Sequence, residues 1–206
     1  MAEMDYKLTY FNMKGLAEPI RMIFAVAGQK YEDVRIPREE WAQHKEKFEY
    51  GQLPVLEVGD KKLAQSNAIT RFLAKKFNLG GADDWEAAKV DELADVMVDF
   101  RSEWRKYFME KDPEKKEELK KTLIETTVPK YLGKVENIQK ENGGDFLVGQ
   151  KLTWIDIQYA HFLEMFEVTT GPEVTAAYPN LKKLQKAVFE TPEIKEWIDK
   201  RPVTEF

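Results

Sequence analysis

The chain has 206 residues, of which 32 are basic and 37 acidic, so its formal net charge at pH 7 is −5. Hydrophobic residues make up 43% and charged residues 33%, a composition typical of a globular protein with one large domain or two small ones. The lack of cysteine excludes disulfides, thiolate zinc sites and a thiol nucleophile in the protein itself, and the negative charge argues against nucleic acid as a partner.

Neither a membrane protein nor a metalloprotein is indicated. The longest wholly apolar run, Met22 to Ala27, is far shorter than the ~20 residues that span a bilayer. The N-terminal MAEMDYK lacks the basic and apolar regions of a signal peptide. The two histidines, His44 and His161, are too isolated for a histidine metal site. We therefore expect a cytoplasmic protein without a membrane segment or a metal.

The first 80 residues change their hydrophobic period repeatedly, as strands and helices do when they alternate. A polar segment from Pro37 to Tyr50 looks loop-like, and Gly59-Asp60 is a two-residue hairpin signal. The pattern predicts, in order, strands at Tyr6–Phe11 and Tyr31–Ile36 around a helix at Ala17–Ala27, then strands at Pro54–Val58 and Lys61–Ala64 and a helix at Asn67–Phe77.

Beyond a Gly-Asp-rich linker at Asn78 to Asp84, every predicted element is a helix. A long first helix carries an apolar stripe, and a second one, from Glu114 to Glu141, should kink at Pro129. Shorter helices are expected over Tyr178–Phe189 and Pro192–Lys200. The stripe consists of Val90, Leu93, Met97, Phe100, Trp104 and Phe108.

The stretch LTWIDI predicts another helix start. Thr153 and Asp156 have the spacing of a capping box, and Leu152 with Ile157 has that of a hydrophobic staple. Taken together, the pattern predicts a small α/β domain over 4–81 and an all-α domain over 83–206.

Two positions in the hairpin region have both a structural and a functional interpretation. Ser66 precedes a helical run and so could simply cap it, but a helix N-terminus can also hold a carboxylate, with Gln65 as a further donor. Pro54 removes a backbone donor at a strand edge. If its peptide bond is cis, the amide and carbonyl of Leu53 turn outward and could pair with an extended peptide.

Three further side chains could carry chemistry. Tyr10 ends the first strand, where tyrosine is more often core or rim than catalytic. Trp41 and Lys45 lie four residues apart and could clamp an anionic group or simply make a surface contact. No Ser-His-Asp set, P-loop or GxGxxG motif is present, which leaves hydrolase and nucleotide-binding interpretations unsupported.

Together, these motifs resemble the cytosolic glutathione S-transferases. They fall in order over nearly the whole chain: YKLTYFNMKGLAEPIR, the Trp41 and Lys45 pair, YGQLPVLEV, QSNAITRFLAKKF and LTWIDIQYA. The N-terminal run and the ending KRPVTEF look most like the sigma class, which includes invertebrate enzymes and haematopoietic prostaglandin D synthase, while YGQLP and QSN also resemble the pi class. The resemblance implies a thioredoxin-like N-terminal domain, an all-α C-terminal domain and a homodimer.

The resemblance also implies glutathione as co-substrate and a role for each motif. Tyr10 matches the tyrosine that hydrogen-bonds the glutathione sulfur, and Tyr50 falls where some classes place an aromatic key for the neighbouring subunit. The remaining contacts implied are Trp41 and Lys45 near the glycyl end, Gln52 and Leu53 at the cysteinyl backbone before a cis Pro54, Gln65 and Ser66 at the γ-glutamyl end, and Asp99 from the partner subunit.

One position departs from the family pattern. Many sigma and pi members have arginine where this chain has Leu16. We therefore expect a donor that supports the tyrosine–thiolate site to be missing or replaced, and the neighbouring Lys14 is too close in sequence to be assumed as the substitute.

The second substrate is expected in an apolar pocket between the two domains. The candidate wall residues are Phe11, Met13, Trp104, Tyr107 and Phe108, and Phe206 could help to close the pocket. Simple packing between the domains is an equally good interpretation of the same side chains.

The function implied is conjugation of the glutathione thiolate to hydrophobic electrophiles in detoxification. Two alternatives stay open: a glutathione-dependent prostaglandin isomerase or lipid peroxidase, and a non-enzymatic ligandin or crystallin-like protein. An intact Tyr10 and the absence of a long insertion after the first long helix favour an enzyme.

Overall fold

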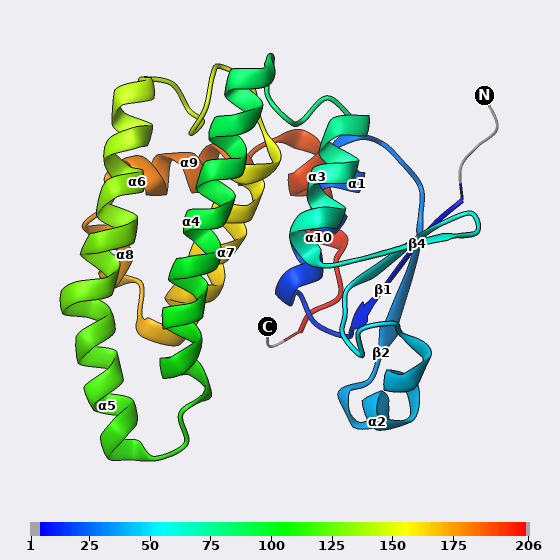
Figure 1. Cartoon of the computed structure of the whole chain (residues 1–206). Coiled ribbons are helices and arrows are strands. Elements are labelled where there is room, and N and C mark those ends of the chain that lie inside the picture. The colour runs from blue at the N-terminus through cyan, green and yellow to red at the C-terminus, as the bar shows by residue number, and fades with distance from the viewer. Residues whose placement is uncertain (1–4, 205–206) are drawn as a thin grey trace. The chain divides into compact units, whose positions relative to one another are not determined.

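A four-stranded sheet forms from the first third of the chain in the computed structural model, which describes residues 5–204 (Figure 1). The strand order is β2-β1-β3-β4, with β1 parallel to β2 and antiparallel to β3. The strands are β1 (Tyr6–Phe11), β2 (Glu32–Ile36), β3 (Val55–Val58) and β4 (Lys61–Ala64). All four predicted strands are confirmed, with bounds within one residue of those expected.

The strand register brings distant parts of the sequence to one end of the sheet. Thr9 of β1 lies opposite Val55 of β3, and Val55 lies opposite Ala64 of β4. Since Tyr10, Pro54 and Gln65 are the next residues along these strands, all three lie at this end. The end of β2 lies there too, because β2 runs parallel to β1.

Three helices belong to the same unit as the sheet (Figure 1). They are α1 (Glu18–Val26), which follows the short turn η1 (Gly15–Ala17), α3 (Ser66–Lys76) and α10 (Pro192–Lys200). Of these, α3 contacts β3 and β4, and α1 contacts both α3 and α10. The apolar positions predicted for α1 are its core, since Ile20, Ile23 and Phe24 are fully buried. Helical period 3.6 places these side chains on one face, and burying each contributes about 1.5–3 kcal/mol.

The polar segment after β2 differs from the loop expected. It forms three short turns, η2 (Arg38–Glu40), α2 (Trp41–His44) and η3 (Lys45–Lys47), followed by irregular chain. None of the three turns contains a buried residue. Without an apolar stripe the hydrophobic period carries no signal, which is why the sequence pattern missed these turns.

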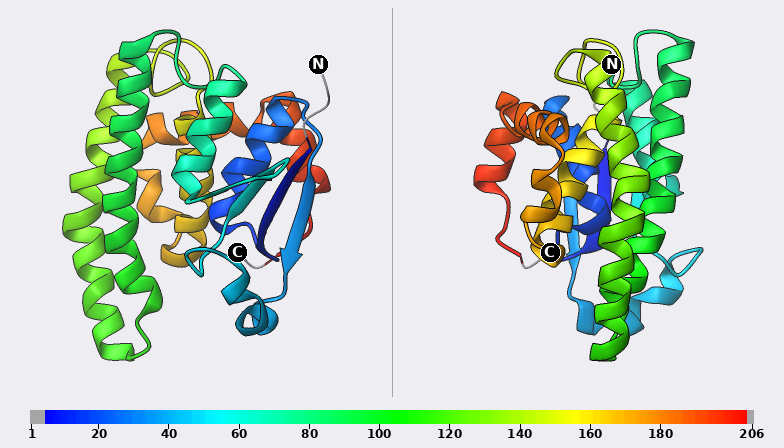
Figure 2. Two further views of the ribbon diagram at one scale, coloured as in Figure 1. Left: turned by 45° about the vertical axis from the view of Figure 1, so that its right-hand side comes forward. Right: turned by 90° about the vertical axis from the view of Figure 1, so that its left-hand side faces the viewer.

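The residues Gly80–Glu190 form a helical unit, seen in two views in Figure 2. Its elements are α4 (Asp84–Met109), α5 (Pro113–Thr122), the π-helical turn η4 (Leu123–Thr127), α6 (Val128–Asn142), α7 (Trp154–Thr170), α8 (Glu173–Ala176) and α9 (Pro179–Phe189).

The apolar stripe predicted for α4 is buried from Val90 to Trp104. Its last predicted member, Phe108, is only half-buried, and the last buried side chain of the helix is Tyr107. The second long helix was expected to run from Glu114 to Glu141 with a kink at Pro129. It is instead divided into α5 and α6 by the π-helical turn η4, which ends two residues before this proline. A proline without an N–H cannot continue the regular ladder.

The predicted capping box at the start of α7 is confirmed. The backbone N–H and the hydroxyl of Thr153 both donate to Oδ2 of Asp156 at 2.7 Å. The N–H of Leu147, in the preceding loop, donates to Oδ1 at 2.8 Å. One fully buried carboxylate therefore fixes both the helix start and the loop before it.

The described residues group into two compact units: 5–79 with 191–204, and Gly80–Glu190. The predicted domains, 4–81 and 83–206, differ from this grouping at the C-terminus, because α10 packs on α1 of the sheet unit. An amphipathic pattern specifies that a helix has a buried face but not which partner covers it. Among the helices of the described residues, none combines the length and apolar character needed to cross a membrane.

Candidate functional site

Tyr10 sits at the end of β1 with its ring almost buried, at 6% exposure. Its hydroxyl oxygen accepts a hydrogen bond of 3.1 Å from the backbone N–H of Leu16, in the turn before α1. The side chain of Leu16 offers no hydrogen-bond donor, and the donor at this position is its main-chain amide. Because this amide occupies an oxygen lone pair, it makes the hydroxyl a better donor of its own proton.

Gly15 lets the turn approach the Tyr10 hydroxyl closely. Its φ is +44°, and a Cβ built there would lie 2.7 Å from the Tyr10 hydroxyl oxygen. Both the left-handed backbone and the short contact require glycine. The position could have been noticed in the sequence as a glycine directly before a helix, but its contact with Tyr10 could not.

We expect Gly15→Ala to lower both stability and turnover, because it combines backbone strain with a clash against Tyr10. Gly28→Ala is the matched control, since Gly28 has φ +60° at the other end of α1 and nothing lies within 4 Å of the added Cβ. Urea denaturation should show a loss of about 1 kcal/mol of unfolding free energy for Gly28→Ala and a larger loss for Gly15→Ala, which adds the clash to the strain. Only Gly15→Ala should also lose several-fold in kcat, and equal kcat values would show that the contact has no catalytic consequence.

An aromatic row connects Tyr10 to the segment after β2. The rings of Tyr10 and Phe11 lie 5.4 Å apart, those of Phe11 and Trp41 5.3 Å, and those of Trp41 and Phe48 5.7 Å. Phe48 was not predicted as part of the site. These edge-on and tilted contacts fix the half-buried Trp41 near the end of β1 that carries Tyr10.

Lys45 lies over the turn that leads into β3. A Cβ at Gly51, whose φ is +53°, would meet Cε of Lys45 at 2.9 Å. The exposed ammonium of Lys45 is therefore brought beside the chain just before Gln52. Trp41 therefore lies by its ring contacts beside Phe11, and Lys45 lies beside the chain that leads into β3.

The residues around Pro54 and Gln65 form a second connected group. The Leu53–Pro54 peptide bond is cis, as the resemblance implies. Nε2 of Gln65 donates to Oε1 of Gln52 at 3.0 Å, which joins the chain before β3 to the end of β4. Within residues 5–204, no backbone hydrogen bond occupies the amide or the carbonyl of Leu53. Its main chain can therefore pair with an extended ligand.

The interpretation of Ser66 as the capping residue is wrong. Gln65 occupies the N-cap position, with an unusual φ of 72° for a residue other than glycine, and Ser66 is the first helical residue. No side chain caps the N-terminus of α3. A helix start without a capping side chain presents amide donors and the positive end of its dipole, a suitable partner for a carboxylate. Strained residues such as Gln65 concentrate at functional sites.

The helical unit contains the other predicted site residues. Trp104 stacks on Phe108 at 5.0 Å, and its indole N–H donates to the Thr169 hydroxyl of α7 at 3.1 Å. The Tyr107 hydroxyl donates to the Thr169 carbonyl at 2.8 Å, so Trp104 and Tyr107 also serve the packing of α4 on α7. Asp99 is exposed on α4.

The remaining predicted site residues are Phe11, Met13, Tyr50 and Phe206. Phe11 and Met13 are half-buried at the end of β1 and in the loop after it, and Tyr50 is 61% exposed. Phe206 lies outside the described residues. Within residues 5–204, no cluster of three or more metal-ligating side chains occurs.

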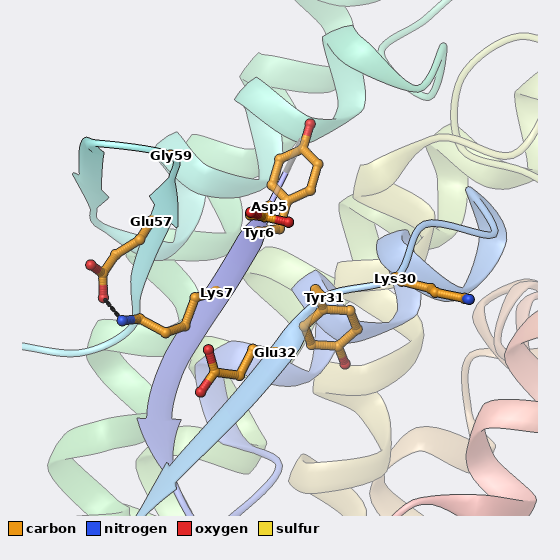
Figure 3. A pocket seen from close by; sticks show the side chains of 8 residues that line it. All are labelled: Asp5, Tyr6, Lys7, Lys30, Tyr31, Glu32, Glu57 and Gly59. Atoms are coloured by element: carbon orange, nitrogen blue, oxygen red, sulfur yellow. Dashed lines mark ion pairs between the residues drawn. The ribbon is translucent and has the colours of Figure 1, made fainter. Parts of the chain in front are cut away.

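A cavity of about 420 Å³ lies at the opposite end of β1 from Tyr10 (Figure 3). Its wall includes Tyr6, Tyr31 and the ion pair of Lys7 with Glu57, whose Nζ and Oε1 are 2.9 Å apart. None of the predicted site residues lines it. The candidate site is the other end of the sheet, where the register brings together Tyr10, Pro54 and Gln65.

A β-α-β and β-β-α sheet with a cis-proline at the start of its third strand defines a thioredoxin-like domain, here joined to an all-α unit. The family model described as "Glutathione S-transferase, N-terminal domain" matches residues 6–75, and the one described as "Glutathione S-transferase, C-terminal domain" matches 98–201. The chain belongs to the glutathione S-transferase family, whose members are transferases that use glutathione as co-substrate.

Relatives cover almost the entire chain. "Probable glutathione S-transferase 5" of Caenorhabditis elegans is 46% identical over 208 residues, covering 98% of this chain and 99% of the relative. The solved prostaglandin synthase D of Nilaparvata lugens is 43% identical, with a TM-score of 0.91, covering 97% of this chain and all of the other. The structure of "monomeric Na-GST-3" from the hookworm Necator americanus is 41% identical, with a TM-score of 0.88 and coverages of 98% and 100%.

Proposed function

We propose that this protein conjugates the glutathione thiolate to hydrophobic electrophiles, with Tyr10 stabilising the thiolate. The observation that carries the proposal is the Tyr10 hydroxyl, held at the end of the sheet by the Leu16 amide. Because the hydroxyl oxygen accepts a hydrogen bond from the Leu16 amide, the hydroxyl group can act as a hydrogen-bond donor to a sulfur anion. The chain itself has no cysteine, so the sulfur must come from the co-substrate.

The energetic demand on Tyr10 is modest. A free thiol with a pKa of about 8.5 is only a few per cent ionised at pH 7. Lowering the pKa of the bound thiol by ~2 requires about 2.7 kcal/mol of preferential thiolate stabilisation. A hydrogen bond to a charged group contributes roughly 1.5–3 kcal/mol, so one tyrosine supplies most of the requirement.

In the proposed reaction the thiol proton leaves to solvent and the thiolate attacks an electrophilic carbon. With a chlorodinitrobenzene-type substrate, a C–S bond forms and the C–Cl bond breaks with release of chloride. Incubation of the purified protein with glutathione and this substrate tests the proposal directly. Retention on glutathione-agarose without turnover of any electrophile would instead favour a ligandin-like binding protein.

For glutathione we propose the orientation implied by the resemblance. The exposed main chain of Leu53, the Gln52–Gln65 hydrogen bond and the helix start at Ser66 support it, because together they offer donors along an extended peptide. The proposed contacts are Trp41 and Lys45 with the glycyl carboxylate, Gln52 and Leu53 with the cysteinyl backbone, Gln65 and Ser66 with the γ-glutamyl carboxylate, and Asp99 of the partner subunit with its ammonium.

We expect Ser66→Ala to raise the KM for glutathione about three- to tenfold, because one hydrogen bond to a carboxylate is lost. Trp41→Ala should raise it similarly. Ser102→Ala is a matched control, since Ser102 is an exposed serine on α4 outside the proposed contacts, and its KM should stay unchanged. If both Ser66→Ala and Trp41→Ala bind glutathione like the wild type, the proposed orientation is wrong.

The electrophile is proposed to bind against Phe11, Met13, Trp104, Tyr107 and Phe108. The aromatic and apolar character of these side chains supports a hydrophobic second substrate. A second candidate function is glutathione-dependent isomerisation of a prostaglandin, favoured by the name of the 43% identical Nilaparvata lugens protein. A panel of aryl halides, lipid hydroperoxides and a prostaglandin endoperoxide, each with glutathione, distinguishes conjugation, peroxidase and isomerase activity.

We also propose a sigma-class homodimer that acts in the cytoplasm. The exposed Asp99 and Tyr50 support the dimer, because each is accessible to a neighbouring subunit. Light scattering during size exclusion should then give twice the chain mass of 24.1 kDa. A single-chain mass would overturn the dimer and with it the role of Asp99.

A further inference from the structure

A buried ionic cluster contacts the loop after β1, whose Leu16 amide donates to the Tyr10 hydroxyl. Arg21 and Glu18, one turn apart on α1, have exposures of 0% and 1%. Such charges are costly to bury unless every one is paired, and removing one partner of a buried pair destabilises strongly. Neither residue belongs to the proposed glutathione contacts, so their presence calls for another explanation.

Arg21 ties three segments together. Its Nη1 donates to the Met13 carbonyl at 2.9 Å and to Oε2 of Glu18 at 3.0 Å. Its Nε donates to the Asp33 carboxylate of β2 at 3.2 Å, and Asp33 also receives Nε of Arg35 at 2.8 Å. The guanidinium therefore anchors the loop after β1 to both α1 and the sheet.

This anchored loop is the one that reaches the Tyr10 hydroxyl. Met13 lies three residues before Leu16, whose amide donates to that hydroxyl at 3.1 Å. Between them, Gly15 leaves no room for displacement toward Tyr10, as the 2.7 Å approach of an added Cβ shows. A shift of the Met13 carbonyl is thus transmitted to the Leu16 amide over a very short path.

The C-terminal segment completes the cluster. Oε1 of Glu18 accepts the indole N–H of Trp197, on α10, at 2.8 Å, and Nη1 of Arg201 at 3.1 Å. Arg201 follows α10 directly and is largely buried in this contact, its side chain 12% exposed. Glu18 thereby connects the end of the chain to Arg21 on its other oxygen.

We propose that Arg21 is a positioning residue for Tyr10, and that Arg201 holds Arg21 in place through Glu18. This inference rests on the proposed role of Tyr10 in stabilising the glutathione thiolate. Without Arg201, the buried carboxylate of Glu18 accepts fewer hydrogen bonds. The carboxylate and the guanidinium of Arg21 then change their positions relative to each other. The Met13 carbonyl then moves, and the amide of Leu16 supports the Tyr10 hydroxyl less well.

The test is Arg201→Met, which removes the charge but keeps an unbranched side chain, with Arg201→Lys as the charge-conserving variant. Lys195→Gln is the matched control, since it removes one positive charge from exposed α10 surface. Ionisation of bound glutathione is followed by the ultraviolet absorbance of the thiolate between pH 5 and 9. The titratable groups around Arg21 are Glu18 and Asp33, which it contacts directly, Arg35 through Asp33, Arg201 through Glu18, and Tyr31. Burial raises the pKa of Tyr31 further above this range.

We expect Arg201→Met to raise the pKa of the bound thiol by about half a unit to one unit. The kcat at pH 6.5 should then fall about three- to tenfold, while the KM for glutathione stays within about twofold. Arg201→Lys should recover most of this loss, and Lys195→Gln should match the wild type. Should Arg201→Met not fold, Trp197→Phe, which removes only one N–H donor to Glu18, should shift the thiol pKa in the same direction by a smaller amount.

An unchanged thiol pKa in Arg201→Met, or in Trp197→Phe where Arg201→Met does not fold, would overturn the proposal even if the melting temperature fell, because the cluster would then be purely structural. That result leaves the wild-type thiolate signal and the role of Tyr10 intact. By contrast, a wild-type protein that binds glutathione without ionising it would overturn the proposed function itself and this inference with it.

Discussion

Replacing Tyr10 with phenylalanine is expected to lower kcat for conjugation at pH 6.5 by about ten- to a hundredfold while glutathione still binds. The hydroxyl is the group proposed to donate to the sulfur anion, and its loss returns the thiol pKa toward the ~8.5 of a free thiol. The ring contact with Phe11 at 5.4 Å does not involve the hydroxyl, so the variant keeps its packing.

The measurement pairs kcat with glutathione affinity from calorimetry and with the thiolate absorbance. Tyr6→Phe is the matched control, because Tyr6 lies on the same strand with a buried hydroxyl that has no partner among the described residues. It should leave kcat unchanged. In Tyr10→Phe, the Leu16 N–H loses its acceptor, which should cost about 1 kcal/mol of stability. Turnover close to that of the wild type would remove Tyr10 from its proposed role.

The second large effect is expected from Asp156→Ala, which should lower the free energy of unfolding at pH 7 by about 3 kcal/mol or more. Three donors lose their acceptor: the N–H and hydroxyl of Thr153 and the N–H of Leu147. Each buried donor left unsatisfied costs roughly 1–3 kcal/mol. Asp83→Ala is the matched control, because Asp83 caps α4 through a single exposed hydrogen bond from the Glu86 amide. That variant should lose only about 1 kcal/mol in urea denaturation.

The Asp156 effect should also depend on pH. Burial raises the pKa of Asp156 to about 6, while its hydrogen bonds from Leu147 and Thr153 oppose the rise. Because folding raises this pKa, the contribution of Asp156 is fully present below about pH 4 and is lost as the pH rises through about 6. The gap in unfolding free energy between wild type and Asp156→Ala should therefore shrink by roughly 1–3 kcal/mol from pH 4 to pH 7. A gap that widens with pH would show that the ionised carboxylate is the favoured form.

Local signals predicted the elements well. The period-2 alternation of Tyr6–Phe11 predicted β1, because successive side chains of a strand point to opposite faces of the sheet. The two-residue turn Gly59-Asp60 predicted the β3–β4 hairpin. The capping box of Thr153 and Asp156 was equally readable, since its partners are three residues apart. The helical turns at Arg38–Lys47 were missed because they bury no apolar stripe.

The candidate site was predicted unevenly. Its residues were named through the motif resemblance, and the cis Leu53–Pro54 bond agrees with that resemblance. The position of Ser66 relative to the helix start was wrong by one residue, with Gln65 at positive φ in the capping position. Arg21 carried a possible signal, a single charge inside the apolar run PIRMIF, but nothing in the sequence indicated what that charge would bind.

By itself, the sequence determined the class of fold, the order of its elements, the lack of a protein thiol and the presence of Tyr10 at a strand end. Only the tertiary structure decided what surrounds that tyrosine. The main-chain amide of Leu16 donates to the tyrosine hydroxyl. Arg201 reaches Glu18 across 183 residues of sequence. Periodicity and capping act within one or two turns of chain, whereas a hydrogen bond to a main-chain amide or a buried ion pair depends on where the folded backbone brings two distant segments together.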